Sequence, residues 1–143
     1  MTLAQRFIRS DFLYWLALSI APRAMTRSVL ATDPAILAAA NPIERRRAWD
    51  VLRNVLPVSA RAQGLLNDAH FVATPHQLPL DRIATPTLVI SLEDDRYRTI
   101  EPARSIAAAI PGARLVTYPS GGHVWVGHDA ELMTEIAAFL RDN

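Results

Sequence analysis

The chain has 143 residues, half of them hydrophobic, which is the size and composition of one globular domain. Its 15 basic and 14 acidic residues nearly cancel, so its charge does not favour nucleic acid or an anionic membrane surface. Cysteine is absent, which excludes disulfides, thiolate catalysis and cysteine-based metal sites. We therefore expect a cytoplasmic globular protein that binds neither nucleic acid nor membrane.

The N-terminal region contains an apolar run of ten residues, FLYWLALSIA, at residues 12–21. This run is too short to cross a bilayer, which takes about 20 residues. Arg6 and Arg9 before it and small residues after it are also features of a signal peptide. Asp11 at its border and the lack of a clear small-x-small cleavage site favour an amphipathic or buried helix instead.

Residues 1–72 carry helical signals and no strand pattern. Asp33 before Pro34 is an N-cap followed by proline at the first helical position. The motif NPIE at residues 41–44 repeats that signal and adds an acidic residue at N3, as in a capping box. The one basic run, residues 45–47, is interpreted as a solvated helix face.

The helix that starts at the second of these caps has a clear apolar face and a clear end. Trp49, Leu52 and Leu56 recur at helical spacing, and Pro57 ends the pattern. A further short helix is predicted over residues 61–66. The first half therefore reads as a layer of several helices.

The second half changes from helical to strand periodicity. Residues 73–86 contain three prolines and are predicted to be a connecting segment. TLVIS at residues 87–91 is a continuous apolar run, typical of a buried parallel strand. Residues 101–110 have one apolar helical face, and ARLVTY at residues 113–118 is predicted to be a second strand.

The chain then passes through a loop, PSGGHVWVGH at residues 119–128, into a last helix capped by Asp129. The core-facing stripe expected on this helix consists of Leu132, Met133, Ile136, Phe139 and Leu140. The order strand, helix, strand, helix predicts a parallel β-α-β-α unit, and hence the α/β class.

Two polar loops of this unit are expected to meet. Parallel neighbouring strands lie about 4.8 Å apart, and the loops after them emerge at one edge of the sheet. Asp94 or Asp95 can therefore lie beside His123. A carboxylate beside an imidazole holds the ring in one tautomer and stabilises its cation, as a general base requires. Gly121 and Gly122 let the loop turn with positive φ.

The polar residues also have other interpretations. The acids and the histidine can also be ordinary loop residues, and spacing alone leaves that alternative open. A metal site made of His123, His128 and Asp129 matches no common ligand spacing. His70 and His76 lie in or near the proline-rich connection and are interpreted as surface residues.

The segment PTLVISLEDD, followed 28 residues after Asp95 by GGH, resembles the C-terminal part of α/β-hydrolase fold enzymes over residues 86–143. In that family the catalytic triad runs along the chain as Ser, then Asp or Glu, then His. The resemblance implies Asp95 as the acid and His123 as the histidine. Asp94 is the alternative acid, because Leu92 stands where the family has a glycine three positions before the acid.

The resemblance implies a partial α/β-hydrolase fold. Residues 1–72 would be the helical cap, or lid, residues 73–86 the connection, and residues 87–143 the C-terminal β-α-β-α part of the core. The Gly-x-Ser-x-Gly nucleophile elbow, the earlier strands and the oxyanion-hole loop are not found in the sequence. Ser120 lies too near His123 on the same loop to serve as the nucleophile. We therefore expect the C-terminal portion of such an enzyme, either a truncated gene product or half of a split protein.

The implied reaction is hydrolysis of an ester or other acyl compound by a serine nucleophile. His123 would act as base and then as acid, with Asp95 orienting it. No cofactor or metal is implied, and the chain alone is expected to be inactive. The alternative is a non-catalytic binding or assembly module derived from the same scaffold.

The resemblance also suggests partners. The substrate would be a small apolar acyl compound, and a partner chain or self-association would supply the missing strands. Apolar cap residues either line the substrate pocket or merely bury the cap against the core. They are Phe12, Tyr14, Trp15 and Trp49.

Overall fold

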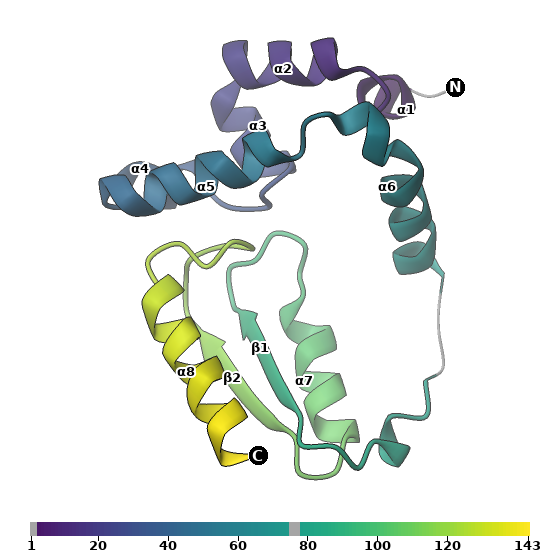
Figure 1. Ribbon diagram of the computed structural model, residues 1–143, viewed down its shortest axis with the longest axis vertical. Helices are drawn as coiled ribbons and strands as arrows, with labels where there is room; N and C mark the ends of the chain where they lie inside the picture. Colours follow the sequence, from purple (N-terminus) through teal and green to yellow (C-terminus); the bar gives the residue numbers. More distant parts are fainter. Residues whose placement is uncertain (1–2, 75–77) are drawn as a thin grey trace.

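The computed structural model describes residues 3–74 and 78–143. A layer of helices lies over one end of a small sheet flanked by helices, as Figure 1 shows. The helices of the layer are α1 (Leu3–Phe7), α2 (Asp11–Ile20), α3 (Pro22–Ser28), α4 (Pro34–Ala39), α5 (Pro42–Asn54) and α6 (Val58–Ala73). The second part contains the short 3-10 helix η1 (Leu80–Arg82), β1 (Leu88–Leu92), α7 (Ile100–Ala109), β2 (Arg114–Tyr118) and α8 (Asp129–Asp142).

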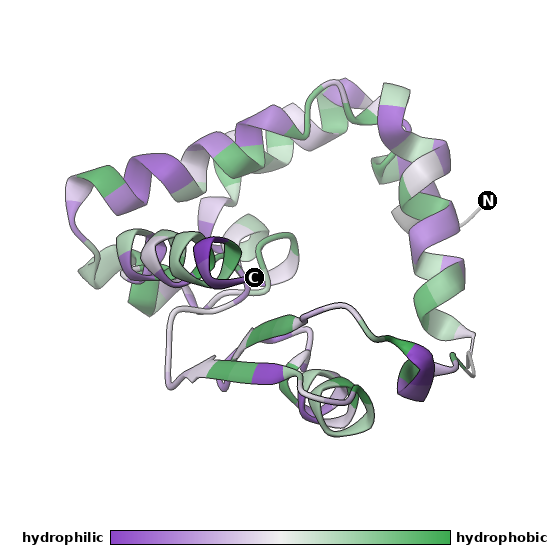
Figure 2. Cartoon of the chain, turned by 60° about the horizontal axis from the view of Figure 1, so that its bottom comes forward, coloured by the Kyte–Doolittle hydropathy of each residue, from purple (hydrophilic) through white to green (hydrophobic). Residues whose placement is uncertain are grey.

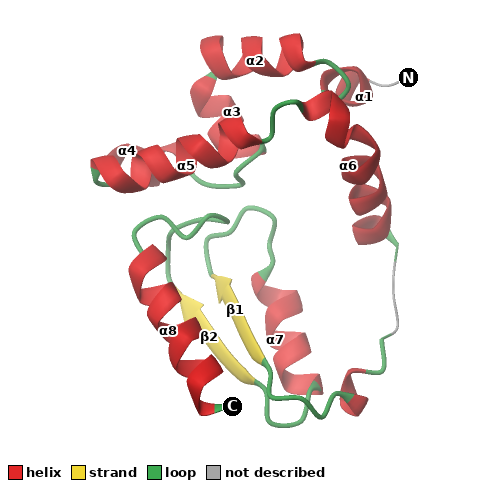
Figure 3. Ribbon diagram, viewed as in Figure 1, coloured by secondary structure: helices red, strands yellow, loops and turns green. Residues whose placement is uncertain are grey.

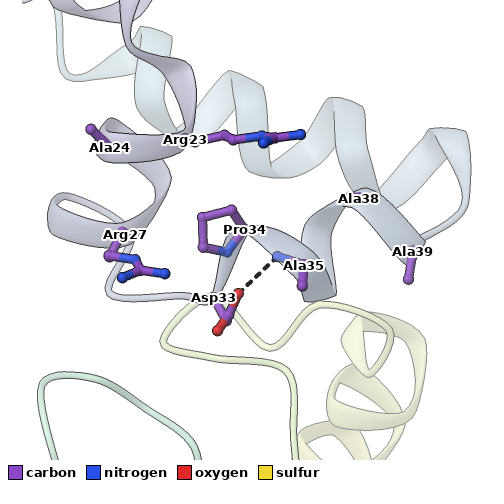
Figure 4. Close-up of a pocket in the computed structure, with 8 residues that line it drawn as sticks. All are labelled: Arg23, Ala24, Arg27, Asp33, Pro34, Ala35, Ala38 and Ala39. Atoms are coloured by element: carbon purple, nitrogen blue, oxygen red, sulfur yellow. Dashed lines mark hydrogen bonds between the residues drawn. The ribbon is translucent and has the colours of Figure 1, made fainter.

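Two predicted caps start helices of the layer. The side chain of Asp33 accepts a 2.8 Å hydrogen bond from the Ala35 N–H at the start of α4 (Figure 4). The side chain of Asn41 accepts a 2.9 Å bond from the Glu44 N–H at the start of α5. Each cap satisfies a backbone donor that has no partner within its own helix, so these helix starts are determined locally.

The apolar run near the N-terminus forms α2. Ser10 caps it, and its side chain accepts a 3.3 Å hydrogen bond from the Leu13 N–H. Tyr14 is buried, and its hydroxyl donates a 2.9 Å bond to the Leu52 carbonyl of α5. The run is therefore a helix packed into the helical layer. In the part of the chain that the structure describes, no helix is both long and apolar enough to cross a bilayer.

Helix α6 is longer than the predicted short helix over residues 61–66. It spans Val58–Ala73, and only Val58 and Ala62 are buried. The helix starts directly after Pro57, and the strong helix formers among its residues extend it without a continuous apolar face. Hydrophobic periodicity alone therefore underestimated its length.

The hydrophobic core of the helical layer includes residues from far along the chain. Tyr14, Leu52 and Val58 are among its least exposed side chains. Val124 and Val126, from the loop between β2 and α8, are buried in the same cluster. Although the sequence assigns this loop to the second half, its valines belong to the core of the first.

The sheet consists of β1 and β2, paired in parallel from Leu88↔Arg114 to Leu92↔Tyr118. Helices α7 and α8 lie on its opposite faces, and the carboxyl ends of both strands point toward the helical layer (Figures 1 and 3). Figure 2 shows the hydrophobic residues of both strands between these helices. This is the predicted β-α-β-α unit, and the mixture of helices and parallel strands is an α/β arrangement.

The predicted burial of this unit holds only in part. Leu92 is buried, but the first three residues of β1 are only half-buried. On α8, Leu132 is buried, whereas Met133 and Leu140 are 48% and 70% exposed, so the expected core-facing stripe is wrong at these two positions. The physical reason is the width of the sheet, since two strands cover less of a helix face than a wider sheet does.

We expect Leu52→Ala to lower the free energy of unfolding by about 3 kcal/mol, because it leaves a cavity in the core of the helical layer. Leu52 is 0% exposed, whereas its neighbour Val51 is 40% exposed. Val51→Ala is the matched control and should cost less than about 1 kcal/mol. Urea denaturation measures both, and equal effects would contradict the assignment of this core.

Candidate active site

The structure brings together the two polar residues that the sequence analysis paired. Asp95 follows β1, and His123 lies in the loop of residues 119–128 after β2, here called the histidine loop. His123 Nδ1 lies 2.9 Å from Asp95 Oδ2. The predicted contact is confirmed, and Asp95 rather than Asp94 makes it.

The carboxylate of Asp95 is buried and fully hydrogen-bonded. Its side chain is 3% exposed. Oδ1 accepts a 2.8 Å bond from the Tyr97 N–H, and Oδ2 also accepts a hydrogen bond from the Thr99 hydroxyl. Burial alone would raise the pKa of Asp95, but the hydrogen bonds from Thr99, His123 and Tyr97 outweigh it and hold the pKa below its usual range. Asp95 is therefore ionised at neutral pH.

The charge on Asp95 determines which nitrogen of His123 carries the proton. An ionised carboxylate only accepts hydrogen bonds, so Nδ1 must be the donor. The lone pair of the neutral ring then lies on Nε2, and no hydrogen bond to this atom is found among the described residues. The His123 side chain is 43% exposed, and the Tyr97 ring packs edge-on against it at 4.8 Å. His123 can thus accept a proton at Nε2 while Asp95 stabilises the cation.

Asp94 has a different role from the one considered in the sequence analysis. Its two carboxylate oxygens accept hydrogen bonds from the backbone N–H groups of Gly121, at 3.1 Å, and Gly122, at 2.9 Å. Asp94 therefore fixes the start of the histidine loop, while the adjacent Asp95 binds the imidazole.

The other end of the histidine loop is held by α5. Glu44 Oε2 accepts a 3.0 Å bond from the Gly127 N–H, and Arg47 donates a 2.7 Å bond to the Val124 carbonyl. Arg47 also pairs with Glu44 at 2.8 Å. The Glu44 side chain thus binds the histidine loop. In a capping box it would instead accept a hydrogen bond from the backbone N–H of Asn41. The solvated face predicted for the basic run is wrong at Arg47, whose side chain is only 23% exposed.

Glu44 and Arg47, like Thr99 and Tyr97, were missed as candidate site residues. An acidic residue at N3 followed by arginine three positions later is common on ordinary helices. Thr99 follows Asp95 by four residues and precedes α7, a position that also suits a helix cap. Glu44, Arg47 and Tyr97 are distinguished only by contacts with distant backbone groups. Thr99 is distinguished only by its side-chain hydrogen bond to Asp95.

The remaining candidates do not join this site. Asp129 is the first residue of α8 rather than its cap, and it accepts a 3.2 Å bond from Trp125 Nε1. His128 lies 3.1 Å from Glu131. Within residues 3–74 and 78–143, no group of three or more His, Cys, Asp or Glu residues is arranged to hold a metal ion, so the structure does not assemble the alternative metal site.

Among the described residues, neither another histidine nor Ser120 is hydrogen-bonded to His123. His70 is exposed on α6, as predicted, and His76 lies outside the described residues. Ser120 is exposed in the histidine loop, and no hydrogen bond between it and His123 is found in the described part of the chain.

Acid should weaken the contact between α5 and the histidine loop. The pKa of Glu44 lies below its ordinary value of 4.5. The main cause is the hydrogen bond from Arg47, and the bond from the Gly127 N–H adds to it, although burial opposes this shift. The stabilisation is therefore fully present above pH 4.5 and is lost as the pH falls through the lower pKa of the folded state. We expect Glu44→Gln to cost about 2 kcal/mol at pH 7, and less as the solution is acidified. Denaturation from pH 7 to pH 3 tests this, and a constant difference would contradict it.

Among the cavities lined by the described residues, two include residues of this site and a third lies within the helical layer. One of about 310 Å³ is lined by Asp95 and His123 together with apolar residues of β1 and α8. One of about 620 Å³ is bounded by Tyr97 and by apolar side chains of the helical layer. The third, of about 740 Å³, lies between α3 and α4, where Figure 4 shows Arg23, Arg27 and Asp33.

Of the four apolar residues of the helical layer considered for a substrate pocket, only Tyr14 lines the 620 Å³ cavity beside Tyr97. Trp15 and Trp49 line a separate cavity of about 560 Å³ between α2 and α5. Phe12 is 64% exposed.

Comparison with known proteins identifies the family of the chain. The family model described as "Serine hydrolase" matches residues 9–141. The protein described as "Putative carbamate hydrolase RutD" from Klebsiella pneumoniae subsp. pneumoniae is 43% identical over 60 residues. The alignment covers 42% of this chain and 21% of the relative, so the chain matches about a fifth of that protein's length. No solved structure matches the chain. Because the family model spans most of its residues, the chain belongs to the serine hydrolase family.

Proposed function

We propose that this chain supplies the general base and its orienting carboxylate to a serine-type hydrolase of esters or other acyl compounds. The observation that supports this most is the 2.9 Å contact between His123 Nδ1 and the buried Asp95, which leaves Nε2 available. In the proposed fold, this is the C-terminal portion of an α/β-hydrolase, and residues 1–72 form its cap.

In the proposed reaction, His123 Nε2 takes the proton of a serine hydroxyl as its oxygen attacks the acyl carbonyl. Asp95 stabilises the imidazolium that forms, and His123 then returns the proton to the leaving group. Water hydrolyses the acyl-enzyme by the same exchange. No serine among the described residues is hydrogen-bonded to His123, so the proposal places the nucleophile on a segment outside these 143 residues.

In the proposed function, the cavity of about 620 Å³ holds the apolar acyl group of the substrate. Phe7, Leu65 and Leu66 are among the apolar side chains that line it, and Tyr97, which forms one wall, contacts the ring of His123. Its volume is typical of small-molecule sites. The relative's description names a carbamate, which is also an acyl compound, so carbamates belong to the proposed substrate class.

The test is an ester hydrolysis assay with and without a nucleophile. Residues 1–143 are assayed on a chromogenic ester and on the matching carbamate. They are then assayed again when joined to a Gly-x-Ser-x-Gly segment, sought in frame in the coding DNA upstream of Met1. We expect turnover only in the joined protein. Turnover by the chain alone that disappears in His123→Ala would mean that these residues contain their own nucleophile, and would overturn the proposal.

A second candidate function is a non-catalytic binding or assembly module. One observation favours this second function: within the described residues, β1 pairs on one side only, with β2. A free strand edge is a template for a strand from a partner chain or from a second copy. A joined protein that binds such a partner but hydrolyses neither compound would favour this function.

A further inference from the structure

The histidine loop is bound at two backbone positions by one charge pair of the helical layer. Arg47 donates to the carbonyl of Val124, the residue after His123, and Glu44 accepts from the N–H of Gly127. Arg47 and Glu44 also bind each other, at 2.8 and 3.3 Å. This arrangement, here called the α5 clamp, spans the part of the loop that follows His123.

The segment inside the α5 clamp has a backbone conformation that needs support. Trp125 has φ of +44°, in the left-handed region, which is unfavourable for a residue with a side chain. Its neighbours Val124 and Val126 turn into the core of the helical layer. The guanidinium of Arg47 also lies 5.8 Å from the centre of the Trp125 ring. Contacts from α5 therefore stabilise a loop shape that its own residues do not favour.

The charges of the α5 clamp are partly withdrawn from water. The side chains of Glu44 and Arg47 are 11% and 23% exposed, whereas those of the ion pair between Arg104 and Glu93 are 47% and 40% exposed. A buried charge is costly unless its hydrogen bonds are satisfied. The two charges of the α5 clamp pair with each other, and each makes one further hydrogen bond to the backbone of the histidine loop, so the loop and α5 hold each other in one arrangement.

We propose that Glu44 and Arg47 are positioning residues for His123, so that the helical layer holds the imidazole against Asp95. The proposal rests on the proposed function, in which His123 is the base. The Nδ1–Oδ2 distance of 2.9 Å leaves little tolerance, and a shift of the Val124 carbonyl by about 1 Å would carry Nδ1 out of hydrogen-bond range. Removing the α5 clamp should therefore separate His123 from Asp95 without any change at either residue.

The test is NMR spectroscopy of the 143-residue chain, which needs no nucleophile. The first readout is the ring N–H signal of His123 at Nδ1, visible while Asp95 protects that proton from exchange. The second is hydrogen exchange at the Gly127 amide. Glu44→Gln and Arg47→Lys are the test variants, because lysine keeps the charge but loses the fork that reaches two acceptors. Asp95→Asn is the positive reference. Arg104→Gln is the matched control, because it removes the exposed ion pairs of Arg104 with Glu93 and Glu101.

We expect both test variants to lose the His123 signal, as Asp95→Asn does, and to exchange the Gly127 amide about tenfold faster. Arg104→Gln should leave both readouts unchanged. Circular dichroism and denaturation establish that each variant is folded. A His123 signal that persists in both folded test variants overturns the proposal. So does a loss that comes only with global unfolding of both, because the α5 clamp would then only stabilise the fold. Failure of ester hydrolysis in the joined protein would overturn the proposed function instead and would not change these readouts.

Discussion

Replacing His123 by alanine is expected to lower kcat/KM for ester hydrolysis by about 10⁴ to 10⁶ in the protein that carries the nucleophile segment. The imidazole is the group that takes the proton from the serine in the proposed reaction, and no other histidine is bonded to Asp95 among the described residues. Asp95→Asn should cost about 10⁴, because an amide can donate to Nδ1 and thereby favour the wrong tautomer.

The matched control for this series is His70→Ala, which removes an exposed histidine from α6. It should leave kcat/KM unchanged. Steady-state kinetics on one chromogenic ester compares all variants with the parent protein. If His123→Ala kept more than a tenth of the parent activity, the assignment of the base would be wrong. If Asp94→Asn were more damaging than Asp95→Asn, the assignment of the acid would be wrong.

Gly122→Ala is expected to cost about 4 kcal/mol of folding free energy, the largest effect on stability that we expect from a single methyl group. A Cβ at this position would lie less than 3 Å from Oγ1, Cγ2 and Cβ of Thr32. Thr32 is fully buried, and its hydroxyl donates a 2.7 Å bond to the Leu30 carbonyl, so it cannot move aside easily. The backbone adds a further cost, because φ of Gly122 is +64°.

Gly112→Ala separates these two contributions. Gly112 has φ of +74°, but a Cβ there would meet nothing within 4 Å. It should therefore show only the conformational cost of about 1 kcal/mol. Denaturant unfolding of both variants measures the difference. Equal destabilisation would mean that the close approach of the histidine loop to Thr32 does not contribute, and that the helical layer does not pack on this loop as described.

The caps and the periodicities of this chain could be read from sequence because they depend on neighbours a few residues apart. The side chains of Asp33 and Asn41 start their helices by accepting hydrogen bonds from backbone N–H groups two and three residues later. The change from helical to strand periodicity located β1 and β2, each within one residue of the structure. Helix α6 was underestimated, because it lacks the apolar face on which the prediction depended.

The pairing of Asp95 with His123 was also accessible, although 28 residues separate them. Parallel strands joined by a helix present their following loops at one edge of the sheet, so topology alone brings the two loops together. The choice between Asp94 and Asp95 depended on the direction of each side chain. The structure assigns Asp95 to the imidazole and Asp94 to the backbone of the histidine loop.

The sequence by itself determined the order of the elements in the second half, the starts of α4 and α5, and the two loops that meet. Tertiary structure alone decided that the histidine loop packs into the helical layer, through Val124 and Val126, and is held by Glu44 and Arg47. The physical reason is sequence distance. The bonds from α5 to the loop join residues 77 and 83 positions apart, and they involve backbone groups that every residue carries. Caps and periodicity depend only on contacts within a few residues. From sequence, a charged side chain on a helix is therefore predicted to be solvated, even where the fold brings a distant backbone group beside it.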